Sequence, residues 1–174
     1  MSCCAMSAGS PAGGTSARLV TTINRYLEEI QLGDRFASGR ARTVTEADFV
    51  TYSCMAGDWV SLHTDADWCE REGPFPGRVA AGCLTLSVAA GLEFSMSGGN
   101  PDKILALYGM DRVRFVKPVF IGDTIHLEGE VTGLEDRDDR RGVLVVHEEI
   151  SNQRNEVVAV LDKRLLIKKR AYDA

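Results

Sequence analysis

One nearly uncharged run in the middle of the chain constrains the fold more than any other feature. The segment Val79 to Ser95, VAAGCLTLSVAAGLEFS, has its first charged residue at Glu93 and is rich in Ala, Gly and Leu. Because it is apolar nearly all round, the run predicts a helix buried on most sides. It is too short, and its flanks are too polar, to span a bilayer. The remaining elements must therefore wrap this helix.

The chain after this helix has the pattern of β-strands. Gly98-Gly99-Asn100-Pro101 breaks the helix, and runs rich in Val, Ile, Leu and Thr follow. Short turns separate them, and the charged segment Glu135 to Gly142 predicts a long exposed hairpin tip. Consecutive strands with short connections favour antiparallel pairing. The expected strands are Ile104–Phe115, Thr124–Leu134, Gly142–Ile150 and Val157–Lys168.

The segment before the central helix predicts one strand and two shorter helices. A strand-like stretch runs from Phe36 to Val44, and a helix from Glu46 to Ala56 follows it, with Thr45 as its expected N-cap. Gly57 ends this helix, and a second short helix is expected at Asp65 to Glu72. The whole pattern predicts an α+β fold, in which an antiparallel sheet of about five strands wraps a long buried central helix.

Length and composition indicate one globular domain. A chain of 174 residues can bury its own core, and we expect residues 23–174 to form a single domain behind a disordered tail at residues 1–22. The net charge of -5 argues against a general nucleic-acid binder. Five cysteines without a C-x-x-C pair indicate reduced thiols and a cytoplasmic protein. Three scattered histidines argue against a structural zinc site.

The segment Gly57 to Asp65, GDWVSLHTD, carries the clearest chemical signal. On a regular helix, the spacing of Asp58 and His63 would turn them about 140° from each other. If they act together, the backbone between them must bend. They would then form an acid–base pair able to handle a water molecule. Taken in isolation, the same spacing is more typical of an N-capping Asp and a half-exposed His.

Three further stretches favour the acid–base pair over the capping role, because they accompany the motif in a characteristic order. The four stretches are Thr45–Phe49, Gly57–Asp65, Arg78–Leu84 and Arg114–Ile125. Together they resemble the MaoC-like hot-dog family, which includes R-specific enoyl-CoA hydratases and related acyl-thioester dehydratases. The match covers roughly residues 30–168, and the joint pattern is far more specific than any one piece.

The resemblance implies a hydro-lyase that interconverts a trans-2-enoyl thioester and the (R)-3-hydroxyacyl thioester without a metal or other cofactor. Asp58 and His63 would share one water, and Gly82 at the N-terminus of the central helix would form an oxyanion hole. Ser87 and Ser61 would support the site. Close helix–sheet packing would also explain Gly82, and a helix serine such as Ser87 commonly bonds its own backbone.

The implied substrate is a coenzyme A or acyl-carrier-protein thioester, whose phosphates need positive partners. Arg78 and Lys117 are the candidates, although solvated surface charges are the commoner role of each taken singly. No nucleic acid or membrane partner is expected. A single sheet leaves an edge strand open, and the resemblance implies a symmetric homodimer or a larger even-numbered assembly.

The chain departs from the family pattern at two places. Val60-Ser61 stands where members commonly carry Asn-Pro or His-Pro, and Ala81-Gly82 stands where many carry His-Gly. Neither change removes an acid–base group. The Val60-Ser61 change affects how the loop between Asp58 and His63 is held, and therefore catalytic efficiency and substrate preference.

Two other functions fit parts of the pattern. Hot-dog thioesterases usually place a carboxylate on the central helix, where this chain has Glu93, more than two turns beyond Gly82. A non-catalytic acyl-thioester-binding subunit would be expected to lose the Asp or the His, and this chain keeps both. Hydration or dehydration is therefore the leading hypothesis.

Overall fold

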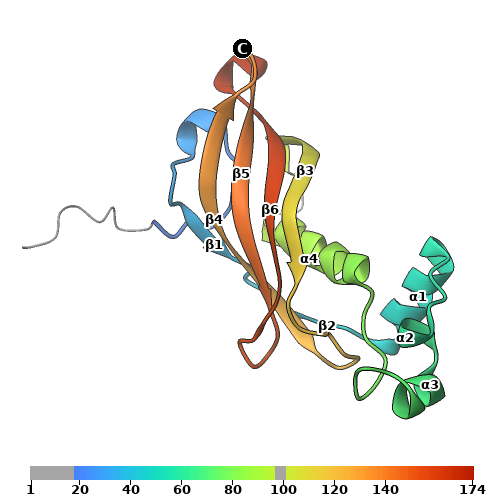
Figure 1. The fold of residues 1–174 in the computed structure, drawn as a ribbon. Coiled ribbons are helices and arrows are strands. Elements are labelled where there is room, and N and C mark those ends of the chain that lie inside the picture. The colour runs from blue at the N-terminus through green and yellow to red at the C-terminus, as the bar shows by residue number, and fades with distance from the viewer. Residues whose placement is uncertain (1–17, 97–100) are drawn as a thin grey trace, which may run out of the picture.

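A computed structural model describes residues 18–96 and 101–174 of the chain. Figure 1 shows a long sheet with one helix, α4, against one face and a lobe of short helices at one end. The helices are α1 (Glu46–Ala56), α2 (Ser61–Thr64), α3 (Ala66–Arg71) and α4 (Gly82–Met96), with 3₁₀ turns at Leu27–Glu29 and Arg170–Tyr172. The strands are β1 (Arg35–Ala37), β2 (Arg42–Thr43), β3 (Ile104–Phe115), β4 (Thr124–Asp136), β5 (Arg141–Ser151) and β6 (Val157–Lys168).

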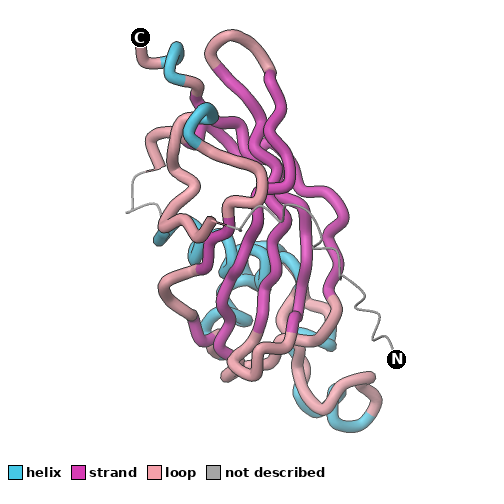
Figure 2. Tube along the Cα trace, turned by 90° about the vertical axis from the view of Figure 1, so that its left-hand side faces the viewer, coloured by secondary structure: helices cyan, strands magenta, loops and turns pink. Residues whose placement is uncertain are grey.

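The strands form one antiparallel sheet, as the sequence predicts. Its order is β1-β4-β5-β6-β3, and β2 pairs with the far end of β4. The long strands run side by side in Figure 2, where the loops gather at the two ends of the sheet. The C-terminus lies at the end opposite the lobe of α1, α2 and α3 (Figure 1). The predicted α+β arrangement of a sheet wrapped on a central helix is confirmed.

Two details of the predicted sheet are wrong. The single strand expected over Phe36 to Val44 is two short strands, because Ala37 pairs with Glu128 and Arg42 with Ile125. Five steps along this segment therefore span three steps of β4, and the extra residues loop out. The sheet consequently has six strands.

The expected hairpin tip at Glu135 to Gly142 is also shorter than predicted. Glu135 pairs with Val143 and Asp136 with Gly142, so β4 and β5 continue into the charged segment. Exposed charged side chains do not prevent strand pairing, since they point into solvent while the backbone groups pair.

The central helix buries one face, not most sides. Leu84, Val88 and Leu92 are buried against the sheet, with Phe36, Ile125 and Leu165 among the core residues on the strands. The opposite face leaves Cys83, Ser87 and Phe94 exposed. The prediction of a nearly all-round buried helix fails for the single chain because one sheet can cover only one side of a helix. Cys83 is exposed for the same reason.

The first residues described lie beside the sheet. The Val20 N–H donates to the Arg35 carbonyl at 2.7 Å, and the Arg18 guanidinium makes two bonds to the buried Asp34 carboxylate. Most of the predicted tail, residues 1–17, falls outside the described residues. Over the parts of the chain that are described, no helix combines the length and apolarity needed to cross a membrane.

Candidate active site

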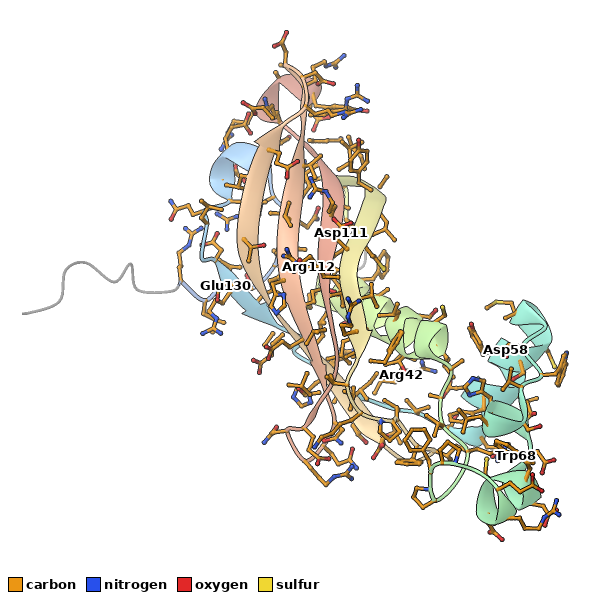
Figure 3. All side chains as sticks on the ribbon, viewed as in Figure 1. Arg42, Asp58, Trp68, Asp111, Arg112 and Glu130 are labelled. Atoms are coloured by element: carbon orange, nitrogen blue, oxygen red, sulfur yellow. The ribbon has the colours of Figure 1, made fainter. Side chains whose placement is uncertain are left out.

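Asp58 lies in the break that the sequence predicts between two helices. Gly57 caps α1 in the left-handed conformation, with φ 69°, and its N–H donates to the Ser53 carbonyl at 2.9 Å. Asp58 follows in irregular backbone before α2 begins at Ser61. Glycine suits this cap because it has no Cβ to clash at positive φ. The turn therefore directs the chain, and the Asp58 carboxylate with it, away from the axis of α1. Figure 3 labels Asp58 on this lobe.

His63 lies on α2 and is held by the segment that leads into α4. Its Nδ1 lies 2.6 Å from the Val79 carbonyl oxygen, while the Val79 N–H donates to the Leu62 carbonyl at 3.1 Å. The other ring nitrogen, Nε2, lies 3.9 Å from Asp58 Oδ2. Both side chains are partly buried, with 17% of His63 and 29% of Asp58 exposed. The structure therefore brings together the two residues that the sequence singles out.

This geometry fixes which ring nitrogen of neutral His63 carries the proton. A carbonyl oxygen only accepts, so His63 Nδ1 must carry the proton that it donates to Val79. In the neutral imidazole, Nε2 is then an acceptor, and it faces a carboxylate that also only accepts. The gap of 3.9 Å is too long for a direct hydrogen bond. A water molecule has the two donors that such a pair of acceptors requires.

Gly82 begins α4. The short segment from Val79 to Gly82 connects the start of this helix to His63, because His63 bonds the Val79 carbonyl. The Ala80 N–H donates to the Val119 carbonyl at 2.8 Å, and Val79 forms a bridge with Phe120. The first N–H groups of a helix lack partners within the helix and carry positive partial charge. A Cβ on Gly82 would lie 2.5 Å from the Phe115 ring, so this glycine also permits close helix–sheet packing.

A pocket of about 320 Å³ lies beside His63 and Gly82, and Asp58 is not among the residues that line it. His63, Gly82 and Lys117 line it with a largely apolar set of side chains from the lobe, α4 and the sheet. Besides these three residues, the lining consists of Leu62, Phe75, Val79, Ala80, Thr85, Phe115, Val116, Pro118, Val119 and Val158. A pocket with apolar walls and few polar groups is typical of sites for small organic ligands.

Two residues near the pair were not singled out by the sequence. Burial raises the pKa of Tyr52, and the neighbouring Cys83 thiol and Asp58 carboxylate raise it further, so the phenol stays protonated beside Asp58. The buried Cys69 thiol lies 3.7 Å and 3.6 Å from the carbonyl oxygens of Ser61 and Leu62, and its weak hydrogen bonds hold α2. Neither has a local sequence signal, because each acts through a contact between separate helices.

The predicted supporting serines occupy different surroundings. Ser61 opens α2, and its carbonyl accepts from the Asp65 N–H at 2.9 Å. The Ser87 hydroxyl donates to the Cys83 carbonyl at 2.8 Å, within its own helix. That is the common behaviour of a helix serine. Support of the Asp58–His63 loop by either hydroxyl stays a prediction.

The two predicted phosphate-binding cations each have an acidic partner. Arg78 makes a two-pronged ion pair with Glu46 at the start of α1, which lowers the pKa of Glu46 and raises that of Arg78. Lys117 lines the pocket, and its Nζ lies 2.7 Å from Glu156. Arg78 therefore ties the lobe to the loop before α4, whereas Lys117 has its charge at the pocket. Within residues 18–96 and 101–174, no three His, Cys, Asp or Glu side chains cluster in a way that could hold a metal ion.

A single antiparallel sheet wrapped on one helix, with an apolar pocket at the start of that helix, defines the hot-dog class of proteins, and solved hot-dog structures share this fold. The model of the MaoC-like domain matches residues 29–153. The chain belongs to the MaoC-like domain family.

Named relatives within this family differ in how much of them the chain covers. It is 44% identical over 103 residues to protein MaoC of Klebsiella aerogenes, which is 59% of this chain but only 29% of that protein. It is 30% identical to an (R)-specific enoyl-CoA hydratase of Rhodospirillum rubrum, covering 64% of this chain and 73% of the relative. A solved structure of a monoamine oxidase regulatory protein from Archaeoglobus fulgius is 37% identical, with a TM-score of 0.78 over 88% of this chain and 97% of that one. The family thus contains proteins named as hydratases and a protein named as a regulator.

Proposed function

We propose that this protein is a hydro-lyase that adds water to a trans-2-enoyl thioester, or removes it from the (R)-3-hydroxyacyl thioester. The observation that carries the proposal is the pairing of His63 Nε2 with Asp58 Oδ2 across 3.9 Å, with Nδ1 already committed to Val79. Such a pair of acceptors suits one shared water. The named hydratase relative supports the same chemistry.

The reaction follows from the chemistry of that water. Asp58 and His63 each accept one of its hydrogens, which directs its lone pairs at the β-carbon of the bound thioester. As the new C–O bond forms, one proton passes to the pair and the other stays on the new hydroxyl. The pair then delivers a proton to the α-carbon on the same face. Either of the two residues can act as the formal base in this scheme.

The thioester carbonyl needs positive potential, because charge develops on its oxygen as the β-carbon is attacked. We assign this role to the N–H groups at the start of α4, with Gly82 allowing a close approach. The apolar pocket beside His63 and Gly82 would take the acyl group, and Lys117 at its rim would meet a phosphate of coenzyme A or of an acyl carrier protein. The predicted cytoplasmic location rests on cysteine usage and stays a prediction.

Thioester hydrolysis is a weaker candidate for this site. The central-helix carboxylate that it would require is Glu93, whose side chain is 12% exposed and is bonded to Lys163 beneath the helix. Glu93 does not line the pocket that contains His63 and Gly82. A carboxylate committed to a buried ion pair is poorly placed to activate water against a carbonyl.

A non-catalytic role has one specific observation in its favour, which is the regulatory name of the relative from Archaeoglobus fulgius. Such a protein would bind an acyl thioester without turning it over. The retained Asp58–His63 pair favours catalysis. Tight binding of enoyl-CoA without any turnover would favour the regulatory alternative.

One assay separates the three functions. Crotonyl-CoA and longer enoyl-CoAs are incubated with the protein in ¹⁸O-labelled water, and loss of the conjugated thioester absorbance is followed. We expect the heavy oxygen on the β-carbon of an (R)-3-hydroxyacyl product, with no thiol released above background. Release of coenzyme A in step with substrate loss would establish the thioesterase instead. Absence of turnover with every chain length tested would overturn the hydro-lyase proposal.

A further inference from the structure

Three charged side chains meet in the core between α4 and the sheet, away from the pocket described above. Lys163 on β6 donates from Nζ to Glu148 Oε1 on β5 at 2.8 Å and to Glu93 Oε2 on α4. Exposure is 3% for Lys163, 1% for Glu148 and 12% for Glu93. Glu93 lies about three helical turns from Gly82, at the other end of α4. We call these three residues the buried charge cluster.

The charges of this cluster do not balance when all three groups are ionised. Two carboxylates face one ammonium, which leaves a net charge of -1 in the core. One oxygen of each carboxylate, Glu93 Oε1 and Glu148 Oε2, is buried without a hydrogen-bond partner. A buried, uncompensated negative charge is strongly unfavourable. One proton on either carboxylate removes the imbalance and supplies a donor.

Within residues 18–96 and 101–174, no other cation is hydrogen-bonded or ion-paired to the cluster, and His147 acts on the pKa of Glu148 less than Lys163 does. On β4, the residue paired with Glu148 is Gly129, and on β6 it is Leu161. His147, adjacent on β5, points to the other face of the sheet, where its Nδ1 lies 2.8 Å from Asp162. Arg112, labelled in Figure 3, is ion-paired with the same Asp162.

We propose that the buried charge cluster binds one proton in mildly acidic solution, and that release of this proton as the pH rises weakens the packing of α4 on the sheet. Within the cluster, the Lys163 ammonium on β6 is the group that bonds both Glu93 on the central helix and Glu148 on β5. When the proton leaves, the two carboxylates repel each other across that single ammonium. The fold therefore contains a pH-sensitive element that is independent of the Asp58–His63 pair.

The direction of the pKa shifts agrees with this geometry. Burial and, to a smaller extent, the Glu93 charge raise the pKa of Glu148 from 4.5 to about 7, against the opposing effect of Lys163. Burial lowers the pKa of Lys163, but the two carboxylates raise it more, so the ammonium stays charged. Between pH 4.5 and about 7 the folded chain holds a proton that the unfolded chain has lost. Stability therefore falls as the pH rises through this window and levels off above it.

The test compares urea unfolding of the full chain, at one fixed protein concentration, across pH 5 to about 8. We expect the folding equilibrium constant of the wild type to fall by about two orders of magnitude more than that of Glu148→Gln. Glu149→Gln is the matched control, because Glu149 is the next residue on β5 but is exposed. It should retain the wild-type profile. Glu93→Gln should flatten the profile as well, and it replaces Glu148→Gln if that variant does not fold.

Infrared difference spectroscopy gives a direct readout of the proton. A protonated carboxylic acid has a carbonyl stretch distinct from that of a carboxylate. We expect the wild type and Glu149→Gln to show this band at pH 6 and to lose it by pH 9, and Glu148→Gln to lack it. Parallel stability profiles in all variants, with no carboxylic-acid band in the wild type at pH 6, would overturn the proposal.

Discussion

Asp58 and His63 meet across a gap that neither side chain fills, so the proposed reaction depends on both residues and one water. Asp58→Asn or His63→Ala should lower turnover of enoyl-CoA by about 10²–10⁴-fold with the circular dichroism spectrum unchanged. The double variant should be little worse than either single one, because groups that act as a unit are not additive.

The matched control for this pair is Asp67→Asn on the neighbouring helix. Asp67 is 77% exposed and is paired with Arg71, so its loss removes one carboxylate from the same lobe without touching the pocket. It should leave turnover near the wild-type value. Near-normal hydration of every tested enoyl thioester by Asp58→Asn would contradict the mechanism.

Gly82 has two explanations that one pair of variants can separate. Gly82→Ala places a methyl group 2.5 Å from the Phe115 ring, so it should cost about 1–3 kcal/mol of stability by overpacking and should also lower turnover. Adding Phe115→Ala removes the ring that the methyl group meets.

The double variant Gly82→Ala/Phe115→Ala separates a packing role of Gly82 from a catalytic one. We expect chemical denaturation to show that Phe115→Ala relieves the strain added by the methyl group, while turnover stays below that of Phe115→Ala alone. If turnover recovers together with stability, Gly82 serves packing only and the oxyanion hole must be sought elsewhere.

At the scale of elements, the connection from α1 to α2 positions the acid. Gly57 has φ 69°, so Gly57→Ala should cost about 1 kcal/mol, while Gly57→Asn should cost less. Turnover should fall in both variants as Asp58 shifts. Urea unfolding and steady-state kinetics measure the two effects.

Gly39→Ala is the control for this prediction. A Cβ there would meet nothing within 4 Å, and the residue is not among the positive-φ glycines. It should therefore leave both quantities nearly unchanged. A Gly57→Ala variant as stable and active as the wild type would show that the left-handed cap is not required.

At the scale of the whole molecule, β3 and α4 leave apolar surface uncovered. Strand β3 is at one end of the sheet order, and its Leu107 and Tyr108 are 55% and 46% exposed. The outer face of α4 is exposed as well. We infer that a second copy covers these surfaces, as the resemblance to hot-dog proteins implies.

Light scattering on the purified chain should report a dimer or a larger even-numbered assembly. Leu107→Asp should shift the measured oligomeric state towards the monomer, because a charge at the edge strand β3 opposes its association with a second copy. Leu32→Asp is the control, since Leu32 is 61% exposed and precedes Gly33, whose N–H donates to Val131 on β4, a strand that β5 and β6 separate from β3. A stable monomer of the wild type at micromolar concentration would contradict the inferred assembly.

Local patterns along the chain predict the antiparallel sheet, the central helix, the α1 helix from Glu46 to Ala56 and the break after Gly57, and the structure has all four. These features follow from local periodicity and from the conformational freedom of glycine, which act over a few residues. The motif also identified Asp58 and His63 as a pair.

The way that pair is held depends on contacts between segments that are distant in the sequence. The bond from His63 to Val79, the ring of Phe115 over Gly82 and the engagement of Arg78 by Glu46 each join residues that are at least 16 positions apart. Tertiary packing also explains three features that the local patterns did not predict. The strand expected at Phe36 to Val44 is split, one face of α4 is exposed, and Lys163 lies between two buried carboxylates. Contacts of this kind depend on which surfaces pack together, and no local pattern in a single sequence encodes that choice.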